Sequence, residues 1–129
     1  MKVIPLSIAC CLAGQLAAQT PAPSTDVYVY RLAPMATRVI NITNRAGYDN
    51  QPGWFGSAVY YTAQSGGQTD IRVYSLETGA VAPVTSTPES EYSAAPTPDG
   101  TGMAVIRVEM DSAQRLWRFP LHGTSGHPA

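Results

Sequence analysis

The amino-acid sequence predicts an all-β fold built from a repeated unit of about 44 residues. The segment Asp-Val-Tyr-Val-Tyr-Arg-Leu at residues 26–32 reappears as Asp-Ile-Arg-Val-Tyr-Ser-Leu at residues 70–76, a step of 44 residues. A third copy, Arg-Leu-Trp-Arg-Phe-Pro-Leu, ends at Leu121, which lies 45 residues after Leu76. No segment after the first 18 residues shows convincing helical periodicity, so the repeats are predicted to consist of strands and turns.

Two shorter segments keep nearly the same step. Tyr-Asp-Asn-Gln-Pro at residues 48–52 corresponds to Tyr-Ser-Ala-Ala-Pro at residues 92–96, and Ile-Thr at residues 42–43 corresponds to Val-Thr at residues 84–85. A period in the low forties that is filled with short strands is typical of a β-propeller blade, which has four antiparallel strands. The sequence holds about two blades after two leading strands, so we predict a partial, open β-propeller. Because propellers close with about four to eight blades, we expect either the amino-terminal part of a longer protein or a fold completed by association.

The first element, residues 1–18, is predicted to be a cleaved signal peptide. A positively charged start, a mostly apolar middle and small residues at positions 17 and 18 follow the order of such a signal. The apolar run is too short to cross a membrane as a helix, so no membrane span is expected. Both cysteines lie within it, where they loosely resemble a lipoprotein signal as an alternative, and cleavage would leave no disulfide. Residues 19–25 are predicted to be a linker.

The blades are predicted to occupy residues 26–121. The expected strands cover residues 26–32, 53–55, 58–62, 71–76, 81–85, 103–108 and 116–121. Between two of them, Pro98 presets a turn, Asp99 can accept hydrogen bonds from the following amides, and Gly100 accepts a positive φ.

The last strands and the tail end the predicted fold. We expect strand 103–108 and the side chains of Leu116, Trp117 and Phe119 to lack a following blade that covers them. Residues 122–129 have no strand pattern and are predicted to form a disordered tail.

The composition argues against several classes of function. The net charge is −1, with no cluster of Lys and Arg, so we expect no nucleic-acid partner. After the signal peptide the only histidines are His122 and His127, both in the predicted tail, and no nucleophile lies beside a positioned base. We therefore expect no enzyme activity, no catalytic residue, no cofactor and no metal site.

The candidate binding residues lie in the segments that lead into the innermost strands. In a propeller these segments open near the central channel, where partner segments can bind. The candidates from two neighbouring blades are Tyr48, Asp49, Asn50, Glu91, Tyr92 and Ser93. Tyrosines with polar neighbours are typical of protein interfaces, so these residues are predicted to form the binding face.

Six segments together resemble the TolB-like, WD-repeat-like propeller proteins of bacteria. They are Ile42-Thr-Asn-Arg45, Pro52-Gly-Trp54, Gln68-Thr-Asp-Ile71, Val84-Thr85, Pro96-Thr-Pro-Asp-Gly100 and Gln114-Arg-Leu-Trp-Arg-Phe119. The first blade has Trp-Phe-Gly at residues 54–56 where the family usually has a Ser-Pro-Asp-Gly turn, so a shortened inner hairpin is expected there.

The resemblance implies an exported, non-enzymatic protein-interaction module of the bacterial cell envelope, because TolB is a periplasmic propeller of that kind. The expected location is periplasmic or secreted, and the expected partners are envelope proteins, with self-association through open blade edges. The alternatives are the amino-terminal propeller part of a prolyl-oligopeptidase-like or dipeptidyl-peptidase-like hydrolase, or a truncated product without independent function. The DNA downstream of codon 129 would separate these alternatives.

Overall fold

A computed structural model describes residues 23–32, 38–121 and 126–129, and in these ranges the regular structure consists of β-strands. The predicted signal peptide and most of the predicted linker lie outside the described residues. Within the described ranges, no helix is long and apolar enough to cross a membrane.

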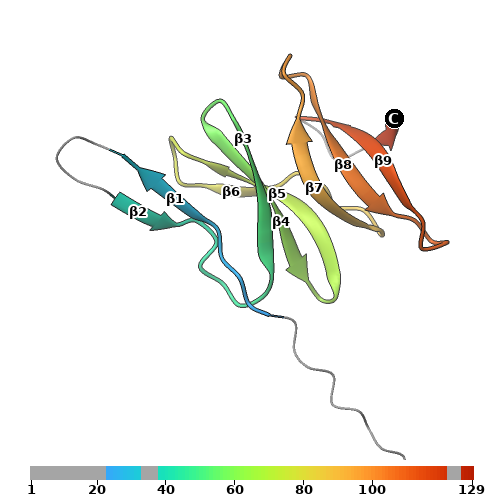
Figure 1. Ribbon diagram of the computed structural model, residues 1–129, viewed down its shortest axis with the longest axis horizontal. Helices are drawn as coiled ribbons and strands as arrows, with labels where there is room; N and C mark the ends of the chain where they lie inside the picture. Colours follow the sequence, from blue (N-terminus) through green and yellow to red (C-terminus); the bar gives the residue numbers. More distant parts are fainter. Residues whose placement is uncertain (1–22, 33–37, 122–125) are drawn as a thin grey trace, which may run out of the picture.

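The strands form three antiparallel sheets, which follow one another along the molecule in chain order (Figure 1). The first sheet pairs β1 (Tyr28–Arg31) with β2 (Arg38–Asn41). The second sheet has the order β3 (Asp49–Phe55), β4 (Ala58–Ser65), β5 (Gln68–Ser75) and β6 (Val81–Pro83). The third sheet has the order β7 (Ser90–Pro96), β8 (Gly102–Val108), β9 (Gln114–Pro120) and β10 (His127–Pro128).

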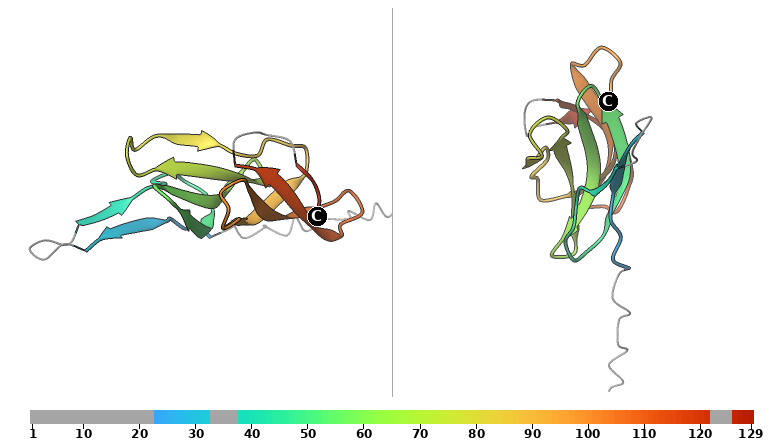
Figure 2. Two further views of the ribbon diagram at one scale, coloured as in Figure 1. Left: turned by 90° about the horizontal axis from the view of Figure 1, so that it is seen from above. Right: turned by 90° about the vertical axis from the view of Figure 1, so that its left-hand side faces the viewer.

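The second sheet lies between the other two and is covered on both faces (Figure 2). Successive side chains of a strand point to opposite faces. On β4, Val59 and Tyr61 therefore pack against the first sheet, and Tyr60 packs against the third. The resulting two cores hold the three sheets together through buried apolar side chains, which are the main source of stability in such a fold.

In each sheet, the last two strands along the chain are joined by the same backbone hydrogen bond. The backbone amides of Ile42, Val84 and Ala129 donate hydrogen bonds to the carbonyl oxygens of Val27, Ile71 and Leu116, at 3.0, 2.8 and 3.1 Å. By this register, β1, β5 and β9 are the third strands of successive blades, and β2, β6 and β10 are the fourth strands. The described residues therefore form the outer half of one blade followed by two four-stranded blades, which confirms the partial, open propeller.

The inner strands differ from the sequence-based correspondence of residues 48–52 with 92–96. Asn50 is paired with Thr62 and Tyr92 with Ile106, and a register shift follows each of them. These shifts are β-bulges, each containing a residue with positive φ. Aligning the bulges moves the correspondence to 42 residues, so Tyr92 is the counterpart of Asn50 and not of Tyr48. The third sheet accordingly begins at Ser90, before the strand expected at residues 103–108.

Both predicted inner turns are present. Phe55 is paired with Ala58 across a two-residue turn, whereas residues 97–101 separate β7 from β8, so the first inner hairpin is the shorter one. In the longer turn the Asp99 carboxylate accepts hydrogen bonds from the amide and hydroxyl of Thr101, and Gly100 has a φ of 69°. A hydrogen bond from the Thr97 hydroxyl, together with those from Thr101, keeps the pKa of the exposed Asp99 carboxyl low, at about 2.

Two expectations about the carboxyl-terminal region need correction. His127–Pro128 forms β10 against β9, although residues 122–129 were expected to be disordered. The outer edge of β9 offers backbone groups that can pair whatever the side-chain pattern is. Met103 and Phe119 are fully buried against the second sheet, so the uncovered face of the third sheet is the opposite one, which carries Leu116.

Candidate binding face at the inner strands

The six candidate residues lie at the beginnings of β3 and β7, which are edge strands of the second and third sheets. The structure brings them into two groups, one for each blade, and gives the members of each group different roles. Asp49 and Glu91 point inward and are buried, whereas Tyr48, Tyr92 and Ser93 are half-buried and Asn50 is exposed.

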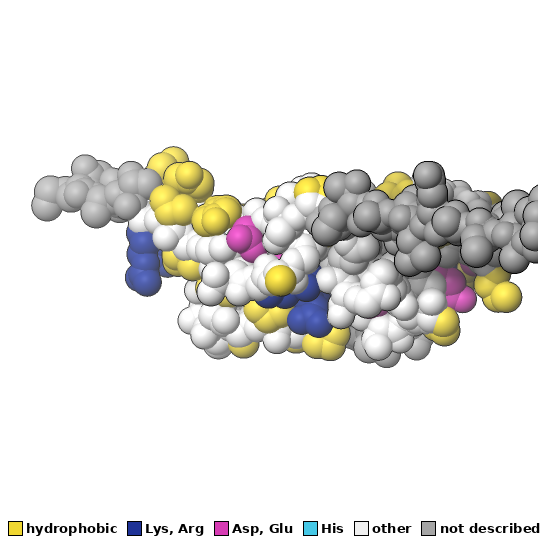
Figure 3. Space-filling model, turned by 90° about the horizontal axis from the view of Figure 1, so that it is seen from below, with side chains coloured by type: hydrophobic (Ala, Val, Ile, Leu, Met, Phe, Trp, Pro, Cys, Tyr) yellow, Lys and Arg dark blue, Asp and Glu magenta, His cyan; other side chains and the backbone are white. Residues whose placement is uncertain are grey.

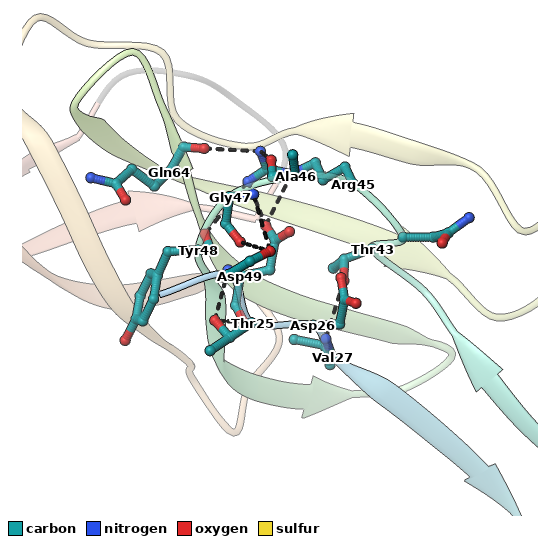
Figure 4. Close-up of polar contacts among 12 residues, drawn as sticks. Thr25, Asp26, Val27, Thr43, Arg45, Ala46, Gly47, Tyr48, Asp49 and Gln64 are labelled. Carbon is teal, nitrogen blue, oxygen red and sulfur yellow. Dashed lines mark hydrogen bonds and ion pairs between the residues drawn. The ribbon is translucent and has the colours of Figure 1, made fainter. Parts of the chain in front are cut away.

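The Asp49 carboxylate anchors the segment that precedes β3 (Figure 4). Its side chain is paired with Arg45, whose Nη2 and Nε lie 2.6 and 3.1 Å from Asp49 Oδ1. Arg45 Nη1 also donates to the carbonyl oxygen of Gln64 at 2.9 Å, and the Asp49 amide donates to the Thr25 carbonyl oxygen at 3.1 Å. The ion pair therefore fixes the entry of β3 against both β4 and the amino-terminal segment.

The Glu91 carboxylate occupies the equivalent place in the next blade. It pairs with an arginine of the neighbouring strand β8, whereas Asp49 pairs with an arginine in the segment before its own strand. Arg107 of β8 donates from Nε to Glu91 Oε1 at 2.8 Å, and the Thr87 hydroxyl donates to the same oxygen. The Arg107 guanidinium stacks on the Trp117 ring, 3.8 Å from its centroid. Burial raises the pKa of the Glu91 carboxyl, while the Thr87 hydrogen bond and the Arg107 charge oppose this increase.

Each buried carboxylate has one oxygen without a hydrogen-bond partner among the described residues, Asp49 Oδ2 and Glu91 Oε2. The same part of the chain contains no group of three or more His, Cys, Asp or Glu side chains placed to hold a metal ion. In the structure the two carboxylates form ion pairs with Arg45 and Arg107, and each pair positions an inner strand.

The bulges of the two inner strands are joined by Gln51, which the sequence-based reasoning missed. Gln51 Oε1 accepts hydrogen bonds from the Thr62 hydroxyl at 2.9 Å and from the Ser93 amide at 3.2 Å. Gln51 and Ser93 both have positive φ values, 53° and 57°. Gly53, two residues after Gln51, was the available sequence signal, because a glycine within a strand often marks a bulge or a close backbone approach.

The exposed part of this face is polar and aromatic. Asn50 Nδ2 donates to the Tyr48 hydroxyl at 3.0 Å, which orders the first group, and the hydrogen bonds of Gln51 bring the second group beside it. Three surface hollows of about 430, 340 and 450 Å³ are lined by residues other than the six candidates. The candidate face thus lies outside these three hollows, along the edges of β3 and β7.

The fold and this face define the class of the protein as a partial β-propeller whose inner strands present a polar, aromatic edge. The chain matches no protein-family model and no curated protein sequence. Among solved structures it is similar to the crystal structure of TolB from Acinetobacter baumannii, with a TM-score of 0.65 and 22% sequence identity. The match covers 81% of this chain and 26% of that TolB chain, so the chain spans about a quarter of TolB. The likeness shows the propeller fold.

Proposed function

We propose that this protein is an exported, non-enzymatic interaction module of the bacterial cell envelope that binds a protein partner through the candidate face. The observation that carries the proposal is the pair of neighbouring edge strands, β3 and β7, whose bulges are joined by Gln51. The TolB-like fold supports the envelope setting, which the resemblance of the sequence segments to TolB-like proteins also favours.

The geometry favours recognition of an extended segment. Edge strands carry backbone amides and carbonyl oxygens that can pair with another strand. Tyrosines beside the edge add apolar contact area at a low cost in conformational entropy. The buried ion pairs of Asp49 and Glu91 hold the two strand entries in place, so less freedom is lost when a partner binds.

Site-specific photo-crosslinking in the envelope of the producing cell tests this proposal. A crosslinking residue at position 48 or 92 should capture the same partner, and the substitutions Tyr48→Ala and Tyr92→Ala together should weaken its binding at least about tenfold. Val81, which is exposed on the outer strand β6, is the matched control position. Equal capture from position 81, or unchanged binding by the double variant, would contradict the proposal.

Export and the absence of catalysis have separate tests. The intact mass of the exported protein should correspond to a chain that begins at Gln19, and a mass that retains the first 18 residues would contradict export with cleavage. The purified protein should not hydrolyse peptide or ester substrates. Hydrolysis that persists after His122→Ala and His127→Ala are combined would reveal a catalytic site and overturn the non-enzymatic assignment.

A further inference from the structure

The contact between neighbouring sheets occurs twice within the chain and uses the same strand positions each time. Toward the preceding sheet, the third strand presents Tyr74 in β5 and Phe119 in β9. Toward the following sheet it presents Val27, just before β1, and Ile71 in β5, and both are buried. The chain therefore contains two copies of one interface, in which an aromatic residue on one sheet packs on the aliphatic face of the sheet before it.

The same positions are exposed at the two ends of the described structure. Tyr30 is the counterpart of Phe119, and its exposed fraction is 64%, compared with 0% for Phe119. Leu116 is the counterpart of Ile71, and its exposed fraction is 54%, compared with 0% for Ile71. Each end of the stack thus exposes one half of the interface that is complete inside it.

At each end, the exposed residue forms an apolar face together with neighbouring side chains of the same sheet. The amino-terminal end face consists of Tyr28, Tyr30 and Val39, on the side of β1 and β2 that points away from the second sheet. The carboxy-terminal end face contains Ala104, Ile106 and Leu116, on the side of β8 and β9 that points away from the second sheet, and the exposed Arg118 lies on the same side opposite Ala104. Figure 3 shows exposed hydrophobic side chains beside basic ones at the end that carries the first sheet.

We propose that a second copy of this chain covers these faces, with the amino-terminal end face of one copy packed on the carboxy-terminal end face of the next. The contact reproduces the arrangement in which Phe119 of the third sheet and Ile71 of the second lie in one core between the two sheets. It is heterologous, because the two surfaces that meet are different, so one copy can bind a neighbour at each end. It involves the outer faces of the end sheets and borders the proposed partner-binding face, because Tyr92 is paired with Ile106 across β7 and β8.

The two-stranded first sheet limits the strength of this contact. Within the chain, a four-stranded sheet packs on the sheet before it, whereas β1 and β2 alone supply the amino-terminal end face. A smaller buried apolar area gives a weaker association. We therefore expect a mass that is above the monomer value and increases with protein concentration.

Light scattering of the purified protein over a concentration series, combined with substitutions at each end, tests the proposal. Tyr30→Asp and Leu116→Asp should each weaken association at least about tenfold, because a buried unpaired carboxylate is costly. Met110→Asp is the matched control: Met110 is 95% exposed and lies in the β8–β9 turn, outside both faces. Circular dichroism should show unchanged β-structure for all three variants.

Mixing the two end variants separates this contact from other modes of association. Each variant keeps the face that the other has lost, so an equimolar mixture of Tyr30→Asp and Leu116→Asp should form a dimer that grows no further. A symmetric contact through either face would not give this result, since the mixture would then add no dimer beyond what one variant forms alone. A wild-type protein that stays monomeric at every concentration, or a mixture that stays monomeric when wild type associates, would overturn the proposal.

Discussion

At the scale of single residues, the burial of charge decides which ion pairs stabilise the protein. The Glu91–Arg107 pair is almost completely shielded from solvent, whereas the Asp111–Arg115 pair, with a similar N–O distance of 2.9 Å, is half-exposed. Removing one partner of a buried pair leaves an uncompensated charge in a poorly solvated site, but the same change at the surface is compensated by water.

The substitution Arg107→Met should therefore lower the free energy of unfolding by about 3–5 kcal/mol. Arg115→Met, the exposed control, should change it by about 0–1 kcal/mol. Because loss of Arg107 raises the pKa of the buried Glu91 further, the Arg107→Met protein should lose stability as the pH rises and regain it as Glu91 is protonated on acidification. Urea unfolding at several pH values measures both effects, and equal losses in the two variants would contradict this account.

Asp99 should give the opposite pH dependence. Its carboxyl pKa is lowered from 3.8 to about 2, so its contribution to stability is present above pH 3.8 and is lost as the pH falls toward 2. Thermal unfolding of Asp99→Asn should differ from wild type at neutral pH, and the difference should shrink in acid. Glu77→Gln, an exposed change of the same charge in another turn, is the control. A difference that is constant with pH would argue against the Asp99 hydrogen bonds.

At the scale of elements, the close approach of β3 and β7 sets the distance between the second and third sheets. A Cβ atom at Gly53 would lie 2.7 Å from the carbonyl oxygen of Ala94 and 3.3 Å from Cδ of Pro96. The first of these neighbours is backbone, so the sheets themselves would have to move. Glycine is needed here for space, since its φ is not among the positive ones.

Gly53→Ala should accordingly destabilise the protein by about 1–3 kcal/mol, as expected when a well-packed contact is overfilled. Ser57→Ala, at an exposed position in the turn of the same hairpin, should leave the midpoint of urea unfolding nearly unchanged. A Gly53→Ala protein as stable as wild type would mean that β3 and β7 are farther apart in solution.

At the scale of the whole molecule, the two separate cores predict unequal stability of the three sheets. β4 has neighbours on both edges and buried side chains on both faces, whereas the first sheet has two strands and is covered on one face. Amides of β4 should therefore be the most protected in native-state hydrogen exchange, and amides of β1 and β2 the least. Uniform protection across the sheets would contradict this prediction and indicate a single cooperative unit.

The repeat period alone predicted much of this fold, because each blade needs the same alternation of buried and exposed side chains. The counterparts Tyr30, Tyr74 and Phe119 occupy one strand position in three sheets, and their spacing is visible in the sequence. The turn of Pro98, Asp99 and Gly100 was predictable for a similar reason, since its hydrogen bonds join residues only a few positions apart.

The tertiary structure alone decided the features that depend on residues distant in the sequence. Glu91 and Arg107 meet because β7 pairs with β8, and no local pattern distinguishes this buried pair from solvated charges. The bulges at Gln51 and Ser93 shift the inner strands to a step of 42 residues, because backbone pairing and the hydrogen bonds between blades outweigh the likeness of Tyr48 to Tyr92. β10 forms because the edge of β9 offers backbone groups that can pair with it. The side chains of His127–Pro128 give no sign of this pairing in the sequence. Local hydrogen bonds and side-chain alternation depend on residues close together in the sequence and can therefore be predicted from it. Burial and pairing across strands depend on distant residues and arise only when the sheets pack.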